Sequence, residues 1–282
     1  MQKGYIGNGK VELIAGGGKV YTDIAARFVR SERELEDIIS SPYSSKLVRR
    51  IINSGHEAAV EFDFFIFGVE GYARVTEVQL VRKRLASYMI KSGRAEKGGK
   101  RSFDIVIPDN IDKFEVKGSL PVNNLTLQDG TSLANYLPDN ETEVIYSYGA
   151  DDILQLIENW YDLGVEEGLP EEDLRYLKPQ ATEFKALIGM NAHALRDWFR
   201  IRCCKNAQRE IRDMANKMLK LCKGEAPDLF KDAGPNCVRL GYCPENEMQH
   251  EDCKGKIITK DKALDIIKSY QRVNKESAAT EE

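Results

Sequence analysis

The chain has 282 residues, a formal net charge of −4 and 42% hydrophobic residues. A chain of this length can bury one large hydrophobic core, and its slightly acidic charge balance disfavours a broad nucleic-acid-binding surface. The start lacks the basic and apolar regions of a signal peptide, and the most apolar stretch, 58–69, is interrupted by Glu61 and Asp63, so no membrane span is predicted. We therefore expect a cytoplasmic protein, whose six cysteines would be thiols or metal ligands rather than disulfides.

The first third of the chain mixes strand and helix signals. Local patterns predict a strand at 11–15, a glycine turn at 16–18, and two helices at 32–39 and 44–53. The first of these helices is expected because Ser31 and Glu34 fit a capping box. Between 58 and 81, aromatic and β-branched residues dominate, which favours strand or buried segments.

The rest of the chain alternates between regular and irregular segments. Alternation predicts a strand at 103–107, and the polar, turn-rich composition of 120–143 predicts an excursion or insertion. Helical spacing then predicts a helix at 151–163, two helices with a bend at 182–222, and a short helix at 260–270. We expect one domain over 1–222 and a cysteine-containing C-terminal extension over 223–282.

A basic segment occupies residues 82–101, where eight Lys and Arg side chains face a single acid, Glu96. Spacings of three and four would align part of this segment on one face of a helix, namely Arg84, Ser87, Lys91 and Arg94. The run Ser-Gly-Arg at 92–94 offers backbone N–H groups and a guanidinium to phosphate oxygens. Charge alone leaves two alternatives open, a phosphate site and a solvated basic face.

The same segment carries a longer motif. Residues 82–95, Arg-Lys-Arg-Leu-Ala-Ser-Tyr-Met-Ile-Lys-Ser-Gly-Arg-Ala, match five of the eight fixed positions of R-H-R-x-x-S-x-N-x-x-S-x-R-Y. Supporting stretches lie in the expected order on both sides of this motif, at Gly55-His56-Glu57, Gln79-Leu80-Val81-Arg82, Arg175-Tyr176-Leu177, Asn191-Ala192 and Ala207-Gln208. Over about residues 10–220, the chain therefore resembles the flavin-dependent thymidylate synthases.

This resemblance implies an activity and a fold. Members of the family are homotetramers that methylate dUMP to dTMP, with methylenetetrahydrofolate as carbon donor and a hydride from FAD that NADPH has reduced. The implied fold is α+β, with a mixed, largely antiparallel sheet flanked by helices. By the same resemblance Arg202 would be catalytic, stabilising negative charge on the uracil ring, a role that suits a permanently protonated cation.

The resemblance also implies two sets of binding residues. The dUMP set would be Gln79, Arg82, Ile90, Lys91, Ser92, Gly93, Arg94, Arg175 and Arg202, with Arg175 reaching in from a neighbouring subunit. The FAD set would be Arg82, Lys83, Arg84, Ile90, Asn191, His193 and Asp197. Six positions depart from the family pattern, most of them on the flavin side: Phe62, Lys83, Met89, Ala95, His193 and Arg209. They leave two alternatives open, a non-catalytic or repurposed paralogue that binds a pyrimidine nucleotide, and a flavoenzyme acting on another pyrimidine nucleotide.

A cysteine-rich region follows the resemblance. Its possible zinc ligands lie among glycines and prolines, and are Cys237, Cys243, His250 and Cys253. The spacing lacks the paired Cys-x-x-Cys of strong zinc motifs, so free thiols are expected, with zinc as the alternative. The remaining cysteines, Cys203, Cys204 and Cys222, are expected on helices.

Overall fold

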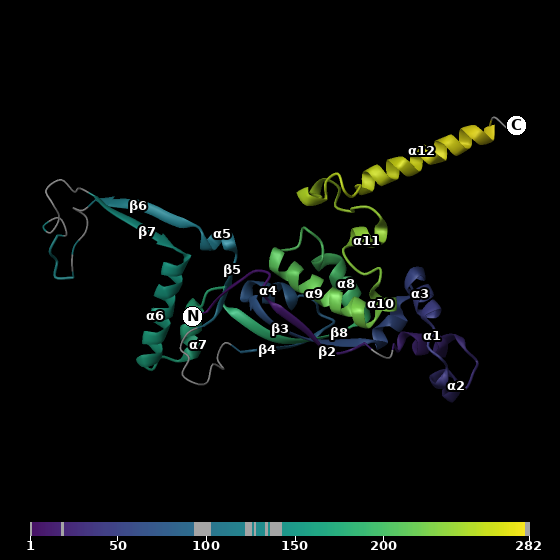
Figure 1. Cartoon of the computed structure of the whole chain (residues 1–282), viewed down its shortest axis with the longest axis horizontal. Helices are drawn as coiled ribbons and strands as arrows, with labels where there is room; N and C mark the ends of the chain where they lie inside the picture. Colours follow the sequence, from purple (N-terminus) through teal and green to yellow (C-terminus); the bar gives the residue numbers. More distant parts are fainter. Residues whose placement is uncertain are drawn as a thin grey trace. The chain divides into compact units, whose positions relative to one another are not determined.

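The fold is described from a computed structural model, drawn in Figure 1. It describes residues 2–17, 20–92, 103–121, 126, 128–132, 135 and 143–279. The chain forms two compact units, one joining 1–6 to 92–183 and the other joining 7–91 to 184–282.

The larger unit is built on a four-stranded sheet with strand order β2-β3-β8-β4. Its strands are β2 (Lys10–Ala15), β3 (Phe64–Ala73), β4 (Ser87–Ile90) and β8 (Glu183–Asn191). The β2 strand pairs antiparallel with β3, and β4 pairs antiparallel with β8. Helices α8 (Ala192–Arg202) and α9 (Arg209–Glu225) lie on one side of this sheet, as Figure 1 shows.

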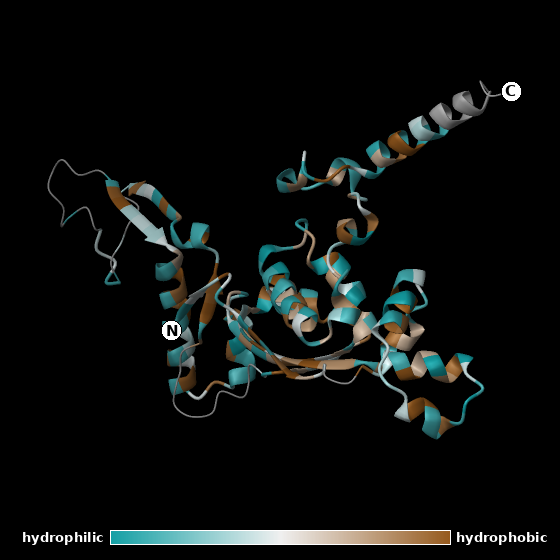
Figure 2. Cartoon of the chain, turned by 45° about the vertical axis from the view of Figure 1, so that its right-hand side comes forward, coloured by the Kyte–Doolittle hydropathy of each residue, from teal (hydrophilic) through white to brown (hydrophobic). Residues whose placement is uncertain are grey.

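The main core lies between this sheet and its helices. Alternate residues of β3 point into it, so Phe65 and Phe67 are fully buried. The Phe65 ring packs edge-on against Phe230, with ring centroids 5.3 Å apart. Figure 2 shows the same arrangement as hydrophobic colour along the strands and hydrophilic colour on the outer helix faces. Burial of these faces is the main stabilising contribution to this unit.

The larger unit also contains further helices, of which the last is the longest. They are α1 (Thr22–Arg30), α2 (Leu35–Ser40), α3 (Ser45–Ser54), η1 (Glu57–Phe62), α4 (Arg74–Leu80), α10 (Pro227–Phe230), α11 (Asn236–Leu240), η5 (Asn246–Met248), η6 (Glu251–Cys253) and α12 (Lys260–Ala279). The predicted helix at 44–53 is confirmed as α3, because Ser44 caps its start and Gly55 ends it with φ 74°. No helix in the described ranges combines the length and apolar character that a membrane crossing needs.

Asp63 joins the starts of two helices in the larger unit. Its buried carboxylate accepts hydrogen bonds from the backbone N–H of Tyr21 at 2.7 Å and of Thr22 at 3.0 Å, and from the Thr22 hydroxyl. Its backbone carbonyl accepts from the N–H of Ala192 at 2.7 Å. Since the first N–H groups of a helix have no partner within the helix, one residue satisfies donors at the starts of both α1 and α8.

The smaller unit has a separate core. Its elements are β1 (Lys3–Tyr5), β5 (Ile105–Ile107), α5 (Asp109–Asp112), β6 (Glu115–Pro121), β7 (Glu143–Gly149), α6 (Ala150–Glu166), α7 (Glu171–Leu174) and η4 (Arg175–Leu177). The β1 strand runs parallel to β5, whereas β6 and β7 pair antiparallel. The core is formed by Phe103, Ile105, Ile107, Leu154, Tyr161 and Leu174.

The predicted α+β class is confirmed, but several predicted elements are not. Residues 74–80 form helix α4 although β-branched residues favoured strand there. Residues 183–191 form strand β8 although helical spacing was expected. In β8 the buried residues alternate through Phe184, Ala186 and Ile188, so pairing in the centre of the sheet decides the structure. Tertiary context overrides local propensity in both segments.

Two other predicted segments, the helix at 32–39 and the excursion at 120–143, have boundaries that differ from the prediction or are only partly described. Helix α2 begins at Leu35 after an N-cap at Glu34, and the Ser31 hydroxyl accepts from the Arg33 N–H, so the predicted capping box is wrong. The ends of the polar stretch 120–143 belong to β6 and β7, and much of its interior lies outside the described residues. Its character as an excursion stays a prediction, as does the division of the chain near residue 222.

We predict that Asp63→Ala lowers the free energy of unfolding by about 2 to 4 kcal/mol, because it leaves buried N–H groups without acceptors. Chemical denaturation followed by circular dichroism measures this change. The matched control is Asp265→Ala on α12, whose carboxylate is 79% exposed and should change stability by less than about 0.5 kcal/mol. Equal effects of the two substitutions would contradict the role given to Asp63.

Candidate functional site

The basic segment forms a turn and a strand. Residues 82–86 are irregular and Ser87–Ile90 form β4, so the segment does not adopt the helix that would have aligned its basic side chains. Because strand side chains alternate, Tyr88 and Ile90 pack against the core while Met89 is exposed. Ser92 is exposed, and Gly93 and Arg94 lie outside the described residues.

Two of the predicted dUMP residues, Arg202 and Gln79, are in direct contact. Arg202 is the last residue of α8, and its guanidinium donates to the Gln79 side-chain oxygen and to the Gln79 backbone carbonyl, each at 3.0 Å. Gln79 lies near the end of α4. These two bonds fix the plane of the guanidinium, which orients its remaining N–H groups.

Positive charge is concentrated around Arg202. Burial lowers the pKa of its guanidinium, and the nearby charge of Arg82 lowers it further. An arginine remains protonated despite such a shift, so two like charges are held close together. A bound anion would relieve their repulsion, which makes this end of α8 suited to a phosphate or to an enolate-like oxygen.

Tyr88 supports the turn that carries the arginines. Its hydroxyl lies 2.8 Å from the Leu80 carbonyl oxygen and 2.9 Å from that of Lys83, and can donate its single proton to either. Burial raises the pKa of Tyr88 to about 12, so the phenol is neutral at physiological pH. Tyr88 was not among the predicted site residues because it occupies a variable position of the motif.

The residues at the predicted flavin positions are also held by contacts within the larger unit. The Lys83 ammonium forms an ion pair with the Asp197 carboxylate on α8. The Asn191 side chain accepts from the Ala194 N–H at 2.7 Å and thereby caps the start of α8. Asn191 therefore has a structural role whether or not it contacts a ligand.

His193 lies between two carboxylates. Its Nδ1 is 3.1 Å from a Glu61 oxygen, and its Nε2 is 3.7 Å from a Glu57 oxygen. Glu57 also pairs with Arg196 at 3.4 Å and with Arg200 at 3.3 Å. The network links η1 to α8 and fixes the histidine ring beside the start of the helix.

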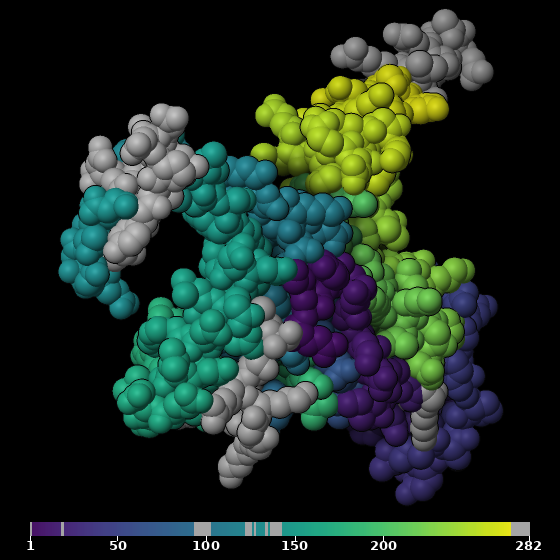
Figure 3. Space-filling view, turned by 60° about the vertical axis from the view of Figure 1, so that its left-hand side comes forward, coloured from purple at the N-terminus to yellow at the C-terminus, as the bar shows by residue number. Residues whose placement is uncertain are grey.

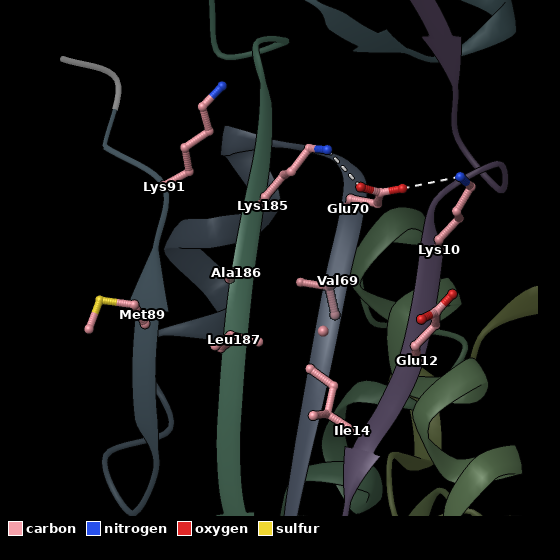
Figure 4. A pocket seen from close by; sticks show the side chains of 11 residues that line it. Lys10, Glu12, Ile14, Val69, Glu70, Met89, Lys91, Lys185, Ala186 and Leu187 are labelled. Carbon is pink, nitrogen blue, oxygen red and sulfur yellow. Dashed lines mark hydrogen bonds and ion pairs between the residues drawn. The ribbon is translucent and has the colours of Figure 1, made fainter. Parts of the chain in front are cut away.

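A pocket of about 420 Å³ lies over the face of the sheet shown in Figure 4. Exposed apolar side chains line it, from Ile14, Met89 and Leu187. At its rim the Glu70 carboxylate joins Lys185 at 2.7 Å to Lys10 at 3.1 Å, and these lysines lower the pKa of Glu70. Lys91 lines this pocket but Arg202 does not, so the structure does not bring these two predicted dUMP residues into one described pocket.

The remaining predicted site residues are distributed as follows. Arg82 and Arg84 are exposed in the turn, and Ile90 pairs in register with Ala186 of β8. Arg175 is exposed at the start of η4, in the smaller unit. The larger unit thus brings together Gln79, Arg82 and Arg202, and separately Lys83 and Asp197.

The C-terminal cysteines lie close to the end of α8. A cavity of about 400 Å³ is lined by side chains that include Cys203, Cys204, Cys237, Cys243, His250 and Cys253. Cys203 caps the end of α8 and Cys204 follows it, so the predicted helical placement is wrong for Cys204, whereas Cys222 does lie on α9. As placed, no three His, Cys, Asp or Glu side chains in the described part of the chain form a group that could hold a metal ion.

Sequence comparisons relate most of this chain to known proteins. The family described as "Thymidylate synthase complementing protein" matches residues 17–228. A flavin-dependent thymidylate synthase from Geobacter sulfurreducens is 33% identical over 215 residues, which cover 76% of this chain and 80% of that protein. One from Sulfolobus acidocaldarius is 30% identical over 258 residues, which cover 89% of this chain and 86% of that protein.

Solved structures show the same fold. The UMP/dUMP methylase PolB from Streptomyces cacaoi, bound with 5-Br dUMP, superposes with a TM-score of 0.57 and 18% identity. The match covers 82% of this chain and 96% of that chain. A second PolB structure, bound with 5-Br UMP, gives a TM-score of 0.51 and 19% identity, covering 81% and 94%.

We predict that Tyr88→Phe lowers the free energy of unfolding by about 1 kcal/mol, because one buried carbonyl loses its donor. Denaturant unfolding measures the change, and hydrogen exchange should show faster exchange in residues 80–84. Tyr270→Phe on α12, where the side chain is 68% exposed, is the control and should leave stability nearly unchanged. Unaltered exchange at the turn in Tyr88→Phe would show that the hydroxyl does not support it.

Proposed function

The chain belongs to the flavin-dependent thymidylate synthase family, and from this membership we propose that it methylates dUMP to dTMP with FAD as cofactor. Methylenetetrahydrofolate would supply the carbon and NADPH the reducing equivalents. The observation that carries the proposal is the contact of Arg202 with Gln79, because it joins two residues that the family motif assigns to the nucleotide. They are 123 positions apart in the chain, so folding has to bring them together.

The charge around Arg202 supports a nucleotide ligand. The guanidinium of Arg82 lies close enough to lower the pKa of Arg202, after the larger effect of burial. A uracil ring that gains negative charge as it is activated would be stabilised by such a fixed cation, since a preoriented donor needs little rearrangement. Ser92, Gly93 and Arg94 would contact the phosphate, and Arg175 would enter the site from a neighbouring subunit of a homotetramer.

The residues at the flavin positions fit an anionic cofactor. Arg82 and Arg84 are exposed on the turn, and their positive charges can pair with the pyrophosphate of FAD. Asp197 anchors Lys83, and Glu61 anchors His193, so both side chains are already oriented. Bound FAD would supply the hydride chemistry, while these residues would bind and orient it. Asn191 and Ile90 complete the proposed flavin set.

A second candidate function rests on the same ion pairs. Asp197 already neutralises the Lys83 ammonium, and Glu61 already contacts Nδ1 of His193, so two side chains at flavin positions have partners within the chain. This observation favours a repurposed paralogue that binds a pyrimidine nucleotide without flavin. Such a protein would keep the Arg202 site for the nucleotide. It would not need Lys83 to contact a flavin, so the lysine could remain paired with Asp197.

Two measurements on the purified protein separate these functions. Visible absorbance before and after incubation with FAD reports flavin binding. Chromatography then reports dTMP formed from dUMP in the presence of NADPH and methylenetetrahydrofolate, with UMP as the comparison substrate. Flavin absorbance together with dTMP formation is the expected result. A colourless protein that cannot be loaded with FAD but binds dUMP would favour the second candidate.

We predict that Arg202→Ala lowers kcat for dTMP formation about 100-fold or more, by removing a cation that stabilises developing charge. The free energy of unfolding should change much less than the activation free energy of the reaction, because Arg202 is at the end of α8 rather than in the core. Steady-state kinetics and denaturation on the same samples measure both effects. Arg50→Ala, an exposed position on α3, is the matched control and should keep wild-type kcat.

A further inference from the structure

Four thiols line one cavity, three from residues 237–253 and one from the turn after α8. Cys204 comes from the turn after α8, Cys237 from α11, Cys243 from the loop that follows, and Cys253 from η6. Cys204, Cys237 and Cys243 also line a second pocket, so the four thiols lie in one region of the fold. Sequence spacing alone suggested three of them, and the fold adds Cys204.

The segment that carries these cysteines has little hydrophobic core of its own. Between residues 236 and 259 only Cys243 and Gln249 are buried, and each helix there has three to five residues. Figure 3 shows the segment, in yellow-green, as part of one compact mass with the start of α12. Small segments with so little apolar burial usually need a metal ion or disulfides to hold one structure.

Backbone hydrogen bonds fix two of the cysteines. Cys243 donates to the Ile258 carbonyl at 2.7 Å, and its own carbonyl accepts from Lys260 at 2.9 Å. The Cys253 carbonyl accepts from Lys256 at 3.1 Å and Ile257 at 3.2 Å, which folds the chain tightly after this cysteine. These hydrogen bonds fix the backbone positions of Cys243 and Cys253 beside the cavity.

We propose that Cys204, Cys237, Cys243 and Cys253 bind one Zn²⁺ ion as a structural site. Zn²⁺ suits this set because structural zinc sites take four thiolates in a tetrahedron. Each thiol loses its proton on binding, so four protons are released and the site carries a net charge of −2. Lys205 and Lys256 line the same cavity and offset part of that charge.

His250 is left out of the ligand set although it lines the cavity. Its Nδ1 accepts a hydrogen bond from the Asp252 N–H at 3.1 Å and so caps η6. The thiols line the cavity but do not meet at one point. Among the described residues, no three side chains of His, Cys, Asp or Glu are already placed to hold a metal ion. Rotation of the cysteine side chains between staggered rotamers would turn the sulfurs inward.

The site would connect the cysteine segment to the end of α8 at Arg202. A second pocket, of about 220 Å³, is lined by side chains that include Arg202, Cys204, Cys237 and Cys243. The Asn206 side chain also donates to the Met248 carbonyl at 2.9 Å, which links the turn after α8 to the same segment. The zinc ion would therefore hold the turn that follows the proposed catalytic arginine.

Metal analysis of the full chain tests this proposal independently of its enzymatic activity. Protein purified without chelator, from cells supplied with zinc, should contain about one zinc ion per chain when measured by inductively coupled plasma mass spectrometry. The double variant Cys237→Ser/Cys253→Ser should lose at least 80% of it. The control Cys222→Ala, a buried thiol on α9 that does not line the cavity, should retain it.

A second measurement covers the case in which the double variant does not fold. Wild-type protein, stripped of metal and loaded with Co²⁺, should develop the intense visible absorption of tetrahedral thiolate coordination. Wild-type protein without stoichiometric metal and without this spectrum would overturn the proposal. So would full zinc retention in the double variant, or an intact mass showing that these cysteines form disulfides.

Discussion

The contact between Arg202 and Gln79 is the interaction on which the proposed site depends. It joins the end of α8 to the end of α4, and it uses both the side chain and the backbone of the glutamine. A guanidinium held by two bonds in one plane cannot turn freely, so its remaining N–H groups keep a fixed direction. Arg82 adds a second positive charge nearby, and together they create a small region suited to an anion.

The rest of the larger unit fixes α8 so that this contact can form. At the start of the helix, the Asn191 side chain and the Asp63 carbonyl accept its first N–H groups. Along its length, Glu57 and Glu61 bind His193 and Arg200, and Asp197 binds Lys83. Anchors at both ends and along one face make α8 a rigid support for residues that contact a ligand.

Some of these features could be predicted from the sequence and others could not. Helix α3 was predictable because Ser44 and Gly55 are local capping signals. Strand β8 and helix α4 were not, because their structure is decided by neighbours distant in the sequence. Motif resemblance selected Arg202 and Gln79, whereas charge spacing alone left a phosphate site and a solvated face open and did not predict strand β4. Tyr88 and Cys204 required the fold, since only folding shows what their side chains face.

Calorimetric titration of dUMP into the flavin-treated protein, compared with the Gln79→Ala variant, tests the central claim most directly. The variant removes the side-chain acceptor that orients Arg202 but keeps both arginine charges. We expect saturable binding to the wild type and an affinity about 10-fold lower in the variant, which corresponds to about 1.4 kcal/mol. Absence of dUMP binding to the wild type, or equal affinity of the two proteins, would contradict a nucleotide site organised by Arg202 and Gln79.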